Sequence, residues 1–151
     1  MVTMVGTEAD FLNLLGDLTS LDHDAIAAYD SAISRIDDPQ FKQQLQLFRE
    51  DHHRHTVELG SIISRLGGTP PSGAGAKSLL AQGKVVLGGL MGDRAILVAM
   101  KTNEDDTNTA YERAVNHEQK HPSADEVLRR GLADERRHRA WIEETIAKLA
   151  A

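Results

Sequence analysis

The chain has 151 residues, enough for one domain with its own hydrophobic core, and its formal charge of −6 argues against nucleic acid or an anionic membrane as the main partner. It has no cysteine, which excludes disulfides, thiolate metal sites, iron–sulfur clusters and cysteine nucleophiles. No apolar run is long enough to cross a bilayer, and residues 1–10 lack the cationic and apolar parts of a secretory signal, so a cytoplasmic protein is expected.

The first half of the chain predicts two helices joined by a short turn. Apolar residues recur every three or four positions over about 8–36, which predicts a helix that ends before Pro39. A second stripe with the same period predicts a helix over about 40–66. Glycines and prolines then cluster in the following ten residues and break the pattern.

The second half predicts two further helices. Asp93 is the expected N-cap of a helix over about 93–117. The segment Ser123–Glu126 reads as a capping box, in which the serine opens a helix over about 123–149. The apolar stripe of this last helix extends to Leu149.

Four helices without a strand pattern predict an all-α fold, a single four-helix bundle over residues 1–151. Each pair joined by a short loop forms an antiparallel hairpin, and the long connector over 67–92 allows a crossover along the bundle. The apolar run Val85–Met91 is expected to pack on the bundle or on a second copy of the chain, as in a homodimer or higher homo-oligomer. The residues expected to be buried in the core are Leu18, Phe48, Leu59, Met100 and Ile142.

Six polar residues interrupt the apolar stripes. A helix turns by about 100° per residue, and on that wheel each of the six lies at the middle or shoulder of its apolar face. They are Asp22 on the first helix, His52 and His55 on the second, Glu104 on the third, and Glu135 and His138 on the fourth. By the same geometry Glu50 and His53 lie off the apolar face. Asp105 and Asp106 are expected to be solvent charges.

The polar positions repeat between the two halves of the chain. A shift of 82 residues relates the first helix to the third, and a shift of 83 relates the second to the fourth. The matched pairs are Asp22 with Glu104, Tyr29 with Tyr111, His52 with Glu135, and His55 with His138. Such a repeat indicates pseudo-twofold symmetry, which would bring the six polar side chains to one level.

Three carboxylates buried at one level need compensating positive charge. A divalent cation provides it directly, since carboxylate and imidazole are ordinary ligands of iron, manganese and zinc. Three negative charges and three neutral imidazoles suit one or two such ions. The alternative is a metal-free polar network, in which His52 and His55 bond to Asp22 or Glu104.

The fourth helix carries a recognisable motif. The segment Leu132–Trp141, with Glu135, His138 and Trp141, resembles the fourth helix of bacterioferritins. The chain as a whole resembles the ferritin-like superfamily, which includes bacterioferritins and rubrerythrins, and its long glycine-containing connector is similar to that of a little-characterised bacterial ferritin-like group. Those bundles have a carboxylate on helices one and three and a Glu-x-x-His pair on helices two and four.

The resemblance implies a ferritin-like antiparallel bundle with iron or manganese between its helices. It also implies that Tyr29 and Tyr111 donate hydrogen bonds to the carboxylates at the metal. Two positions depart from the superfamily pattern, because Asp22 and His52 stand where glutamates are expected. The change at His52 removes a bridging carboxylate, which leaves a mono-metal and a di-metal centre both open.

Three functions follow as hypotheses. The first is an oxidoreductase of the oxidase or ferroxidase kind, in which the bound metal reacts with dioxygen or peroxide. The second is a metal-free helical bundle with a structural or assembly role. The third, a hemerythrin-like oxygen carrier, ranks last because it needs His and Glu four apart on the second helix, where Glu58 instead follows Arg54 at that spacing.

Overall fold

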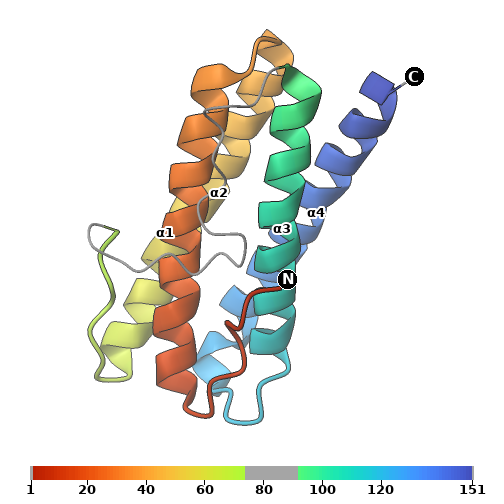
Figure 1. The fold of residues 1–151 in the computed structure, drawn as a ribbon. Coiled ribbons are helices and arrows are strands. Elements are labelled where there is room, and N and C mark those ends of the chain that lie inside the picture. The colour runs from red at the N-terminus through yellow and green to blue at the C-terminus, as the bar shows by residue number, and fades with distance from the viewer. Residues whose placement is uncertain (1, 74–91, 151) are drawn as a thin grey trace.

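The chain forms a bundle of four long helices (Figure 1). The computed structural model describes residues 2–73 and 92–150. The helices are α1 (Phe11–Arg35), α2 (Pro39–Arg65), α3 (Asp93–Val115) and α4 (Asp125–Ala150), and a short 3₁₀ turn, η2 (Pro122–Ala124), precedes α4. The predicted all-α class is confirmed, and every predicted helix end lies within three residues of the observed one.

The order of the helices makes two hairpins. Helix α1 packs along α2, and α3 packs along α4, while α1–α3 and α2–α4 form the other two contacts of the bundle. In Figure 1, α1 and α4 run upward, whereas α2 and α3 both run downward. The end of α2 and the start of α3 therefore lie at opposite ends of the bundle, as the crossover prediction requires. The predicted apolar run Val85–Met91 lies outside the described residues.

Short polar side chains and glycine set the ends of the first two helices. Asp10 caps α1 and Asp38 caps α2, since each carboxylate accepts a backbone N–H from the first turn of its helix. After α2, Gly67 has a φ of 89°, and the amide of Gly68 donates to the carbonyl of Ile63 at 2.9 Å. This Schellman arrangement ends the helix, because glycine adopts positive φ without a steric penalty.

Both predicted capping residues in the second half are wrong, although the helices begin within two residues of the predicted starts. Gly92, not Asp93, is the N-cap of α3, and the Asp93 carboxylate instead accepts the amides of residues 37 and 38, at 2.7 and 2.9 Å. It thereby holds the α1–α2 turn against α3. Ser123 opens no capping box, because the ring of His121 accepts the Ser123 amide at 3.1 Å and starts a 3₁₀ turn ahead of α4.

The core consists of two apolar clusters, one in each half of the bundle. The prediction of the core is confirmed, since at most 1% of each of its five residues is exposed: Leu18, Phe48, Leu59, Met100 and Ile142. Leu149, the last residue of the predicted apolar stripe of α4, is not in the core, because 41% of it is exposed. It lies in the last turns of α4, which diverge from the other helices in Figure 1.

The segment before α1 folds back along α3 (Figure 1). The amide of Thr3 donates to Asp106 at 2.8 Å, and Arg113 donates to the carbonyls of Thr3 and Val5 at 2.7 and 3.1 Å. Asp106 is only 2% exposed, so its prediction as a solvent charge is wrong. The periodicity of α3 cannot show that a distant segment covers that side of the helix.

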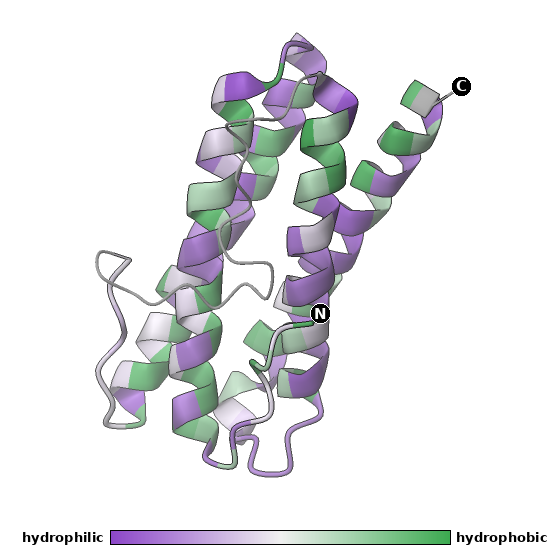
Figure 2. Ribbon diagram, viewed as in Figure 1, coloured by the Kyte–Doolittle hydropathy of each residue, from purple (hydrophilic) through white to green (hydrophobic). Residues whose placement is uncertain are grey.

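Hydrophilic and hydrophobic residues alternate around each helix (Figure 2). Below its hydrophilic first turn, α3 is hydrophobic over the next turns in this view and mostly hydrophilic further down. Among the described residues, no helix combines the length and the apolar character needed to cross a membrane.

Candidate metal centre

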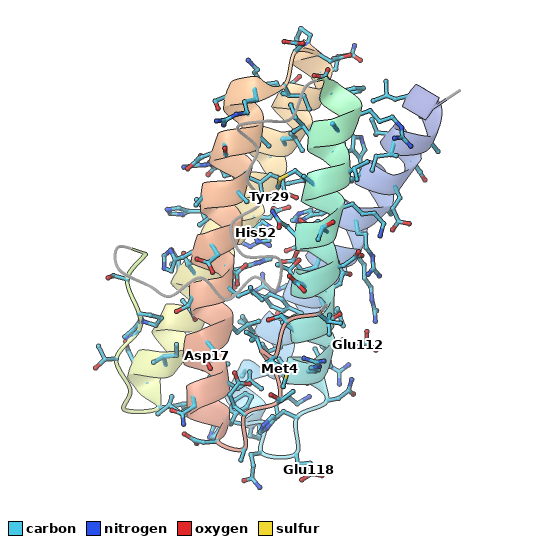
Figure 3. All side chains as sticks on the ribbon, in the orientation of Figure 1. Met4, Asp17, Tyr29, His52, Glu112 and Glu118 are labelled. Carbon is cyan, nitrogen blue, oxygen red and sulfur yellow. The ribbon has the colours of Figure 1, made fainter. Side chains whose placement is uncertain are left out.

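The six inward polar residues meet between the two apolar clusters. Residues near them in sequence belong to both clusters. Leu21 and Leu59 are part of one cluster, and Phe48 and Met100 are part of the other, so the polar residues lie at the boundary between the two. In Figure 3, Tyr29 and His52 mark this level, and both point into the bundle. At most 3% of each of the six side chains is exposed: Asp22, His52, His55, Glu104, Glu135 and His138. All four helices therefore contribute to one buried layer.

The orientation of α2 agrees with the wheel. Glu50 and His53 are exposed, whereas His52 and His55 are buried. The Glu-x-x-His spacing of Glu50 and His53 thus lies on the solvent side, and the inward pair on this helix consists of two histidines.

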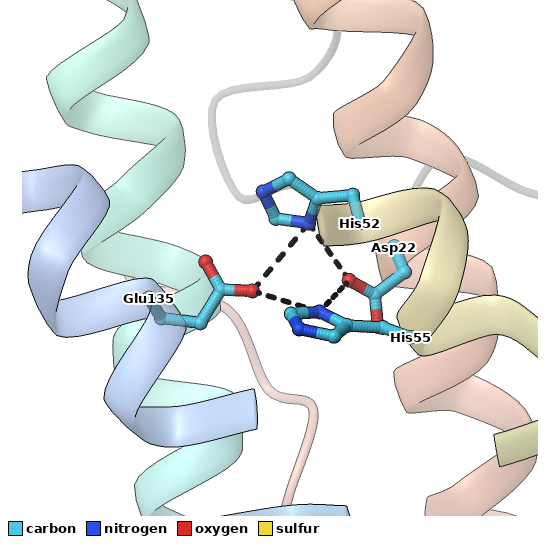
Figure 4. A group of neighbouring side chains, drawn as sticks. All are labelled: Asp22, His52, His55 and Glu135. Carbon is cyan, nitrogen blue, oxygen red and sulfur yellow. Dashed lines mark hydrogen bonds and ion pairs between the residues drawn. The ribbon is translucent and has the colours of Figure 1, made fainter. Parts of the chain in front are cut away.

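Two overlapping groups of four side chains could hold a metal ion. The first is Asp22, His52, His55 and Glu135 (Figure 4), and the second is His52, Glu104, Glu135 and His138. In each group, one ligand atom from every residue lies within 4.8 Å of the other three. The groups share His52 and Glu135.

The first group is held together by close contacts. Oδ1 of Asp22 lies 2.8 Å from Nδ1 of His52 and 3.2 Å from Nδ1 of His55. Oε1 of Glu135 lies 3.4 Å from each of the same two nitrogens. Figure 4 shows these atoms facing one another. Four ligand atoms from α1, α2 and α4 thus converge on one point.

The second group contains buried atoms without a hydrogen bond. Oε1 of Glu104 lies 3.4 Å from Nε2 of His52 and 3.5 Å from Nδ1 of His138. Among the described residues, both oxygens of Glu135 and Nδ1 of His138 are buried and make no hydrogen bond. A buried carboxylate that makes no hydrogen bond is costly, so these atoms fit a bound cation.

Two tyrosines contact the carboxylates crosswise. The hydroxyl of Tyr29, on α1, donates to Glu104 on α3, and the hydroxyl of Tyr111, on α3, donates to Asp22 on α1 at 2.6 Å. Burial raises the pKa of both tyrosines, and the facing carboxylate raises each pKa further. Both phenols therefore keep their protons and act as donors.

Without a metal ion, protons hold the layer together. Burial alone would lower the pKa of His52 and His138, but the surrounding carboxylates raise these pKa values to about 9 and about 11. Burial alone would raise the pKa of Asp22, but His55 and His52 lower it to about 2. The imidazoles are thus cationic beside anionic carboxylates, and a metal ion has to displace their protons.

Comparison with known proteins places the chain in a family. A family described as "Domain of unknown function (DUF2383)" matches residues 10–117. The chain belongs to this DUF2383 family. A comparison with curated proteins and another with solved structures found no match. The family match spans α1 to α3 and ends before Glu135 and His138. In this DUF2383 protein, the position of these two residues beside the other four is therefore known from the structure and not from the family match.

This DUF2383 protein has two further carboxylates at the centre, which sequence reasoning missed. Nε2 of His55 bonds to Asp134 at 2.9 Å, and Nε2 of His138 bonds to Asp51 at 2.8 Å. Each bond crosses between α2 and α4 and turns Nδ1 of the histidine toward the centre. The shift of 83 also relates Asp51 to Asp134, so extending the repeat by one residue would have found them.

Helix α3 contributes more polar groups to this level than predicted. The hydroxyl of Thr107 lies 3.2 Å from Oε2 of Glu104. The Asn108 amide donates to the backbone carbonyls of Glu104 and Glu135, at 2.7 and 3.0 Å. Asn108 therefore links the backbones of α3 and α4 beside the two carboxylates. Periodicity did not select Thr107 and Asn108, because they lie in a long run of polar residues in which no apolar stripe marks the inward face.

Gly131 makes room for Tyr111. A Cβ on Gly131 would lie 2.3 Å from Cε1 of the Tyr111 ring, and this ring is buried. Gly131→Ala is expected to destabilise the fold by about 1–3 kcal/mol, because the ring has to move and its bond to Asp22 is disturbed. Urea denaturation of the metal-free protein measures the change.

Gly16→Ala is the matched control for this substitution. Gly16 is also helical, but no atom lies within 4 Å of its Cβ position. There the better helix propensity of alanine is expected to stabilise the protein by up to about 1 kcal/mol. Effects of the same sign at both glycines would contradict the proposed packing role of Gly131.

Proposed function

We propose that the buried layer binds one or two iron or manganese ions, and that the protein is a ferritin-like metalloprotein of the oxidase or ferroxidase kind. Zinc is also compatible with the donor types. When bound, iron or manganese supplies the redox chemistry, giving electrons to dioxygen or peroxide. The proposed ligands are Asp22, His52, His55, Glu104, Glu135 and His138, with Tyr29 and Tyr111 as donors to the carboxylates.

The buried Glu135 carboxylate, which makes no hydrogen bond, carries this proposal. It has no exposed surface and no hydrogen bond, and its two oxygens face different nitrogens. Oε1 faces His52 and His55, and Oε2 lies 3.6 Å from Nδ1 of His138. A carboxylate in this position can bind one ion or bridge two.

The charge of the layer suits either number of ions. With neutral imidazoles, the three carboxylates carry three negative charges. One divalent ion leaves one negative charge, and two divalent ions leave one positive charge, so both states are close to neutral. The resemblance to bacterioferritins and rubrerythrins favours iron, since those bundles hold their metals between carboxylates and histidines on facing helices.

The protein's own residues would determine what reaches the ions. Each of the six side chains is at most 3% exposed, so bulk water has little access to the layer. Tyr29 and Tyr111 hold the Glu104 and Asp22 carboxylates in place through their hydroxyls. The imidazoles release protons as they become ligands.

A metal-free bundle is the competing function. Its support is that Asp22 already accepts bonds from His52 and His55, so protonated histidines neutralise the layer. Such a layer would fix the register of the helices for a structural or assembly role. It leaves the Glu135 carboxylate without a hydrogen bond, which is why we place it second.

Reconstitution separates the two functions. Metal-free protein titrated anaerobically with iron(II), and separately with manganese(II), is expected to take up one or two ions per chain. At a free metal concentration of a hundred times Kd, the bound ion adds about 2.7 kcal/mol of stability, which raises Tm by about 5–10 °C. Elemental analysis and a thermal melt measure both quantities. No bound metal and an unchanged Tm would establish the metal-free bundle instead.

A further inference from the structure

Four charged side chains form a closed ring on the solvent side of the centre, across the seam between α2 and α4. This Asp–Arg ring consists of Asp51, Arg54, Asp134 and Arg137, and each arginine contacts both aspartates. Arg137 lies 2.8 Å from Asp51 and 3.0 Å from Asp134. Arg54 contacts Asp134 and lies 3.4 Å from Asp51.

The ring lies directly over two proposed ligands. Asp134 bonds to Nε2 of His55 and Asp51 bonds to Nε2 of His138. The side chains of the two aspartates are 16% and 18% exposed, and those of Arg54 and Arg137 are 42% and 54% exposed. A continuous row of polar groups therefore leads from solvent, through arginine and aspartate, to the buried imidazoles.

Helices α2 and α4 also have the least closely packed backbones of the four neighbouring pairs. Helices α2 and α4 make fewer close backbone contacts than the two hairpins or the α1–α3 pair. Along α3, the N-terminal segment adds a further cover, held by Arg113 and Asp106. At this level, side-chain ion pairs and not close backbone contacts join α2 to α4.

We propose that the Asp–Arg ring is the port through which a divalent cation reaches the centre. Asp51 and Asp134 bind the incoming ion first, and it displaces Arg54 and Arg137, the cations that neutralise the two carboxylates in the closed port. The ion then passes to the nitrogens and carboxylates beneath. This inference rests on the proposed function, since a port requires a bound ion.

Substituting lysine for both arginines tests the port while keeping the charge. A lysine ammonium cannot hold two carboxylates in the forked geometry of a guanidinium. In Arg54→Lys/Arg137→Lys, we expect iron(II) to enter and leave about three- to tenfold faster, because weakened ion pairs lower the barrier in both directions. Kd should stay within about twofold of the parent value. Anaerobic stopped-flow mixing measures uptake, and a chromogenic iron(II) chelator measures release.

Substituting glutamine for both arginines distinguishes a port from a purely electrostatic effect of the arginine charges on metal binding. If the arginines acted only through their charge, Arg54→Gln/Arg137→Gln would speed uptake but slow release, since the site would hold a cation more tightly. The port predicts that both rates rise. Arg139→Lys is the matched control on α4, because Arg139 lies 3.5 Å from Asp105 of α3 and does not contact the ring. Its rates should equal those of the parent protein.

The outcomes distinguish the two proposals. A parent protein that binds no iron(II) overturns both the proposed function and the port. A parent that binds iron(II), with ring variants that match its uptake and release rates, overturns the port alone. Faster release with unchanged uptake also overturns it, because the arginines would then only support the histidine orientation.

Discussion

Replacing Glu135 by alanine is expected to abolish metal binding at the centre, and His138→Ala is expected to abolish it in the second group of side chains. Glu135 belongs to both groups of converging side chains, so its loss removes an oxygen from each. His138 offers a buried Nδ1 that makes no hydrogen bond. Asp51 orients the imidazole by bonding to its other nitrogen, Nε2. We expect each variant to lose at least a factor of about a hundred in affinity, more than a supporting residue would cost. His55→Ala should weaken binding strongly.

Glu50→Ala and His53→Ala are the matched controls for that loss. They change the same residue types at the same spacing, but both residues are exposed on α2. Metal content should remain at the parent value in both. Elemental analysis of reconstituted variants, checked for helicity by circular dichroism, decides the comparison, and equal loss in the control variants would refute the proposed ligand set.

The ligand variants should remain folded. Without metal, Glu135 is a buried carboxylate with no hydrogen bond, so its removal can leave stability unchanged or raise it. The loss of metal would then reflect the missing ligand and not an unfolded bundle. Unfolding of Glu135→Ala under metal-free conditions would contradict this reasoning.

Leu59→Ala is expected to destabilise the fold by about 2–5 kcal/mol. Leu59 is fully buried in the cluster that also contains Leu18 and Leu128, so truncation leaves a cavity among residues held by three helices. At about 2–4 °C per kcal/mol for a chain of this size, the Tm should fall substantially. A thermal melt or a urea titration measures the effect.

Leu47→Ala provides the control on the same helix. Leu47 is 56% exposed, and the same substitution there should change stability by no more than about 0.5 kcal/mol. A comparable loss at both positions would show that α2 is rotated relative to the orientation described above. Such a rotation would also move His52 and His55 away from the centre.

Periodicity alone predicted the orientation of each helix about its own axis. It separated His52 and His55 from Glu50 and His53, although a motif search would have chosen the latter pair. It worked because burial of an apolar stripe fixes the inward face, and any polar residue on that stripe is carried inward with it. The repeat between the two halves of the chain, with shifts of 82 and 83 residues, further predicted that the six residues lie at one level of the bundle.

Contacts between helices could not be predicted in the same way. The bonds from Asp51 to His138 and from Asp134 to His55 join residues 87 and 79 positions apart. They depend on how far α2 and α4 are displaced along each other, and the pattern of one helix contains no information about that displacement. Both aspartates also lie beside the apolar stripe and not on it, so the wheel gives no reason to select them.

Four helices, their inward faces and the six candidate ligands thus follow from the sequence alone. The cover over Asp106, the fit of Tyr111 against Gly131 and the Asp–Arg ring above the centre appear only in the folded chain. The difference arises because local periodicity reflects burial, which each helix shows in its own residues. Partners across the bundle are set by the packing of side chains from distant segments, which exists only in the folded chain.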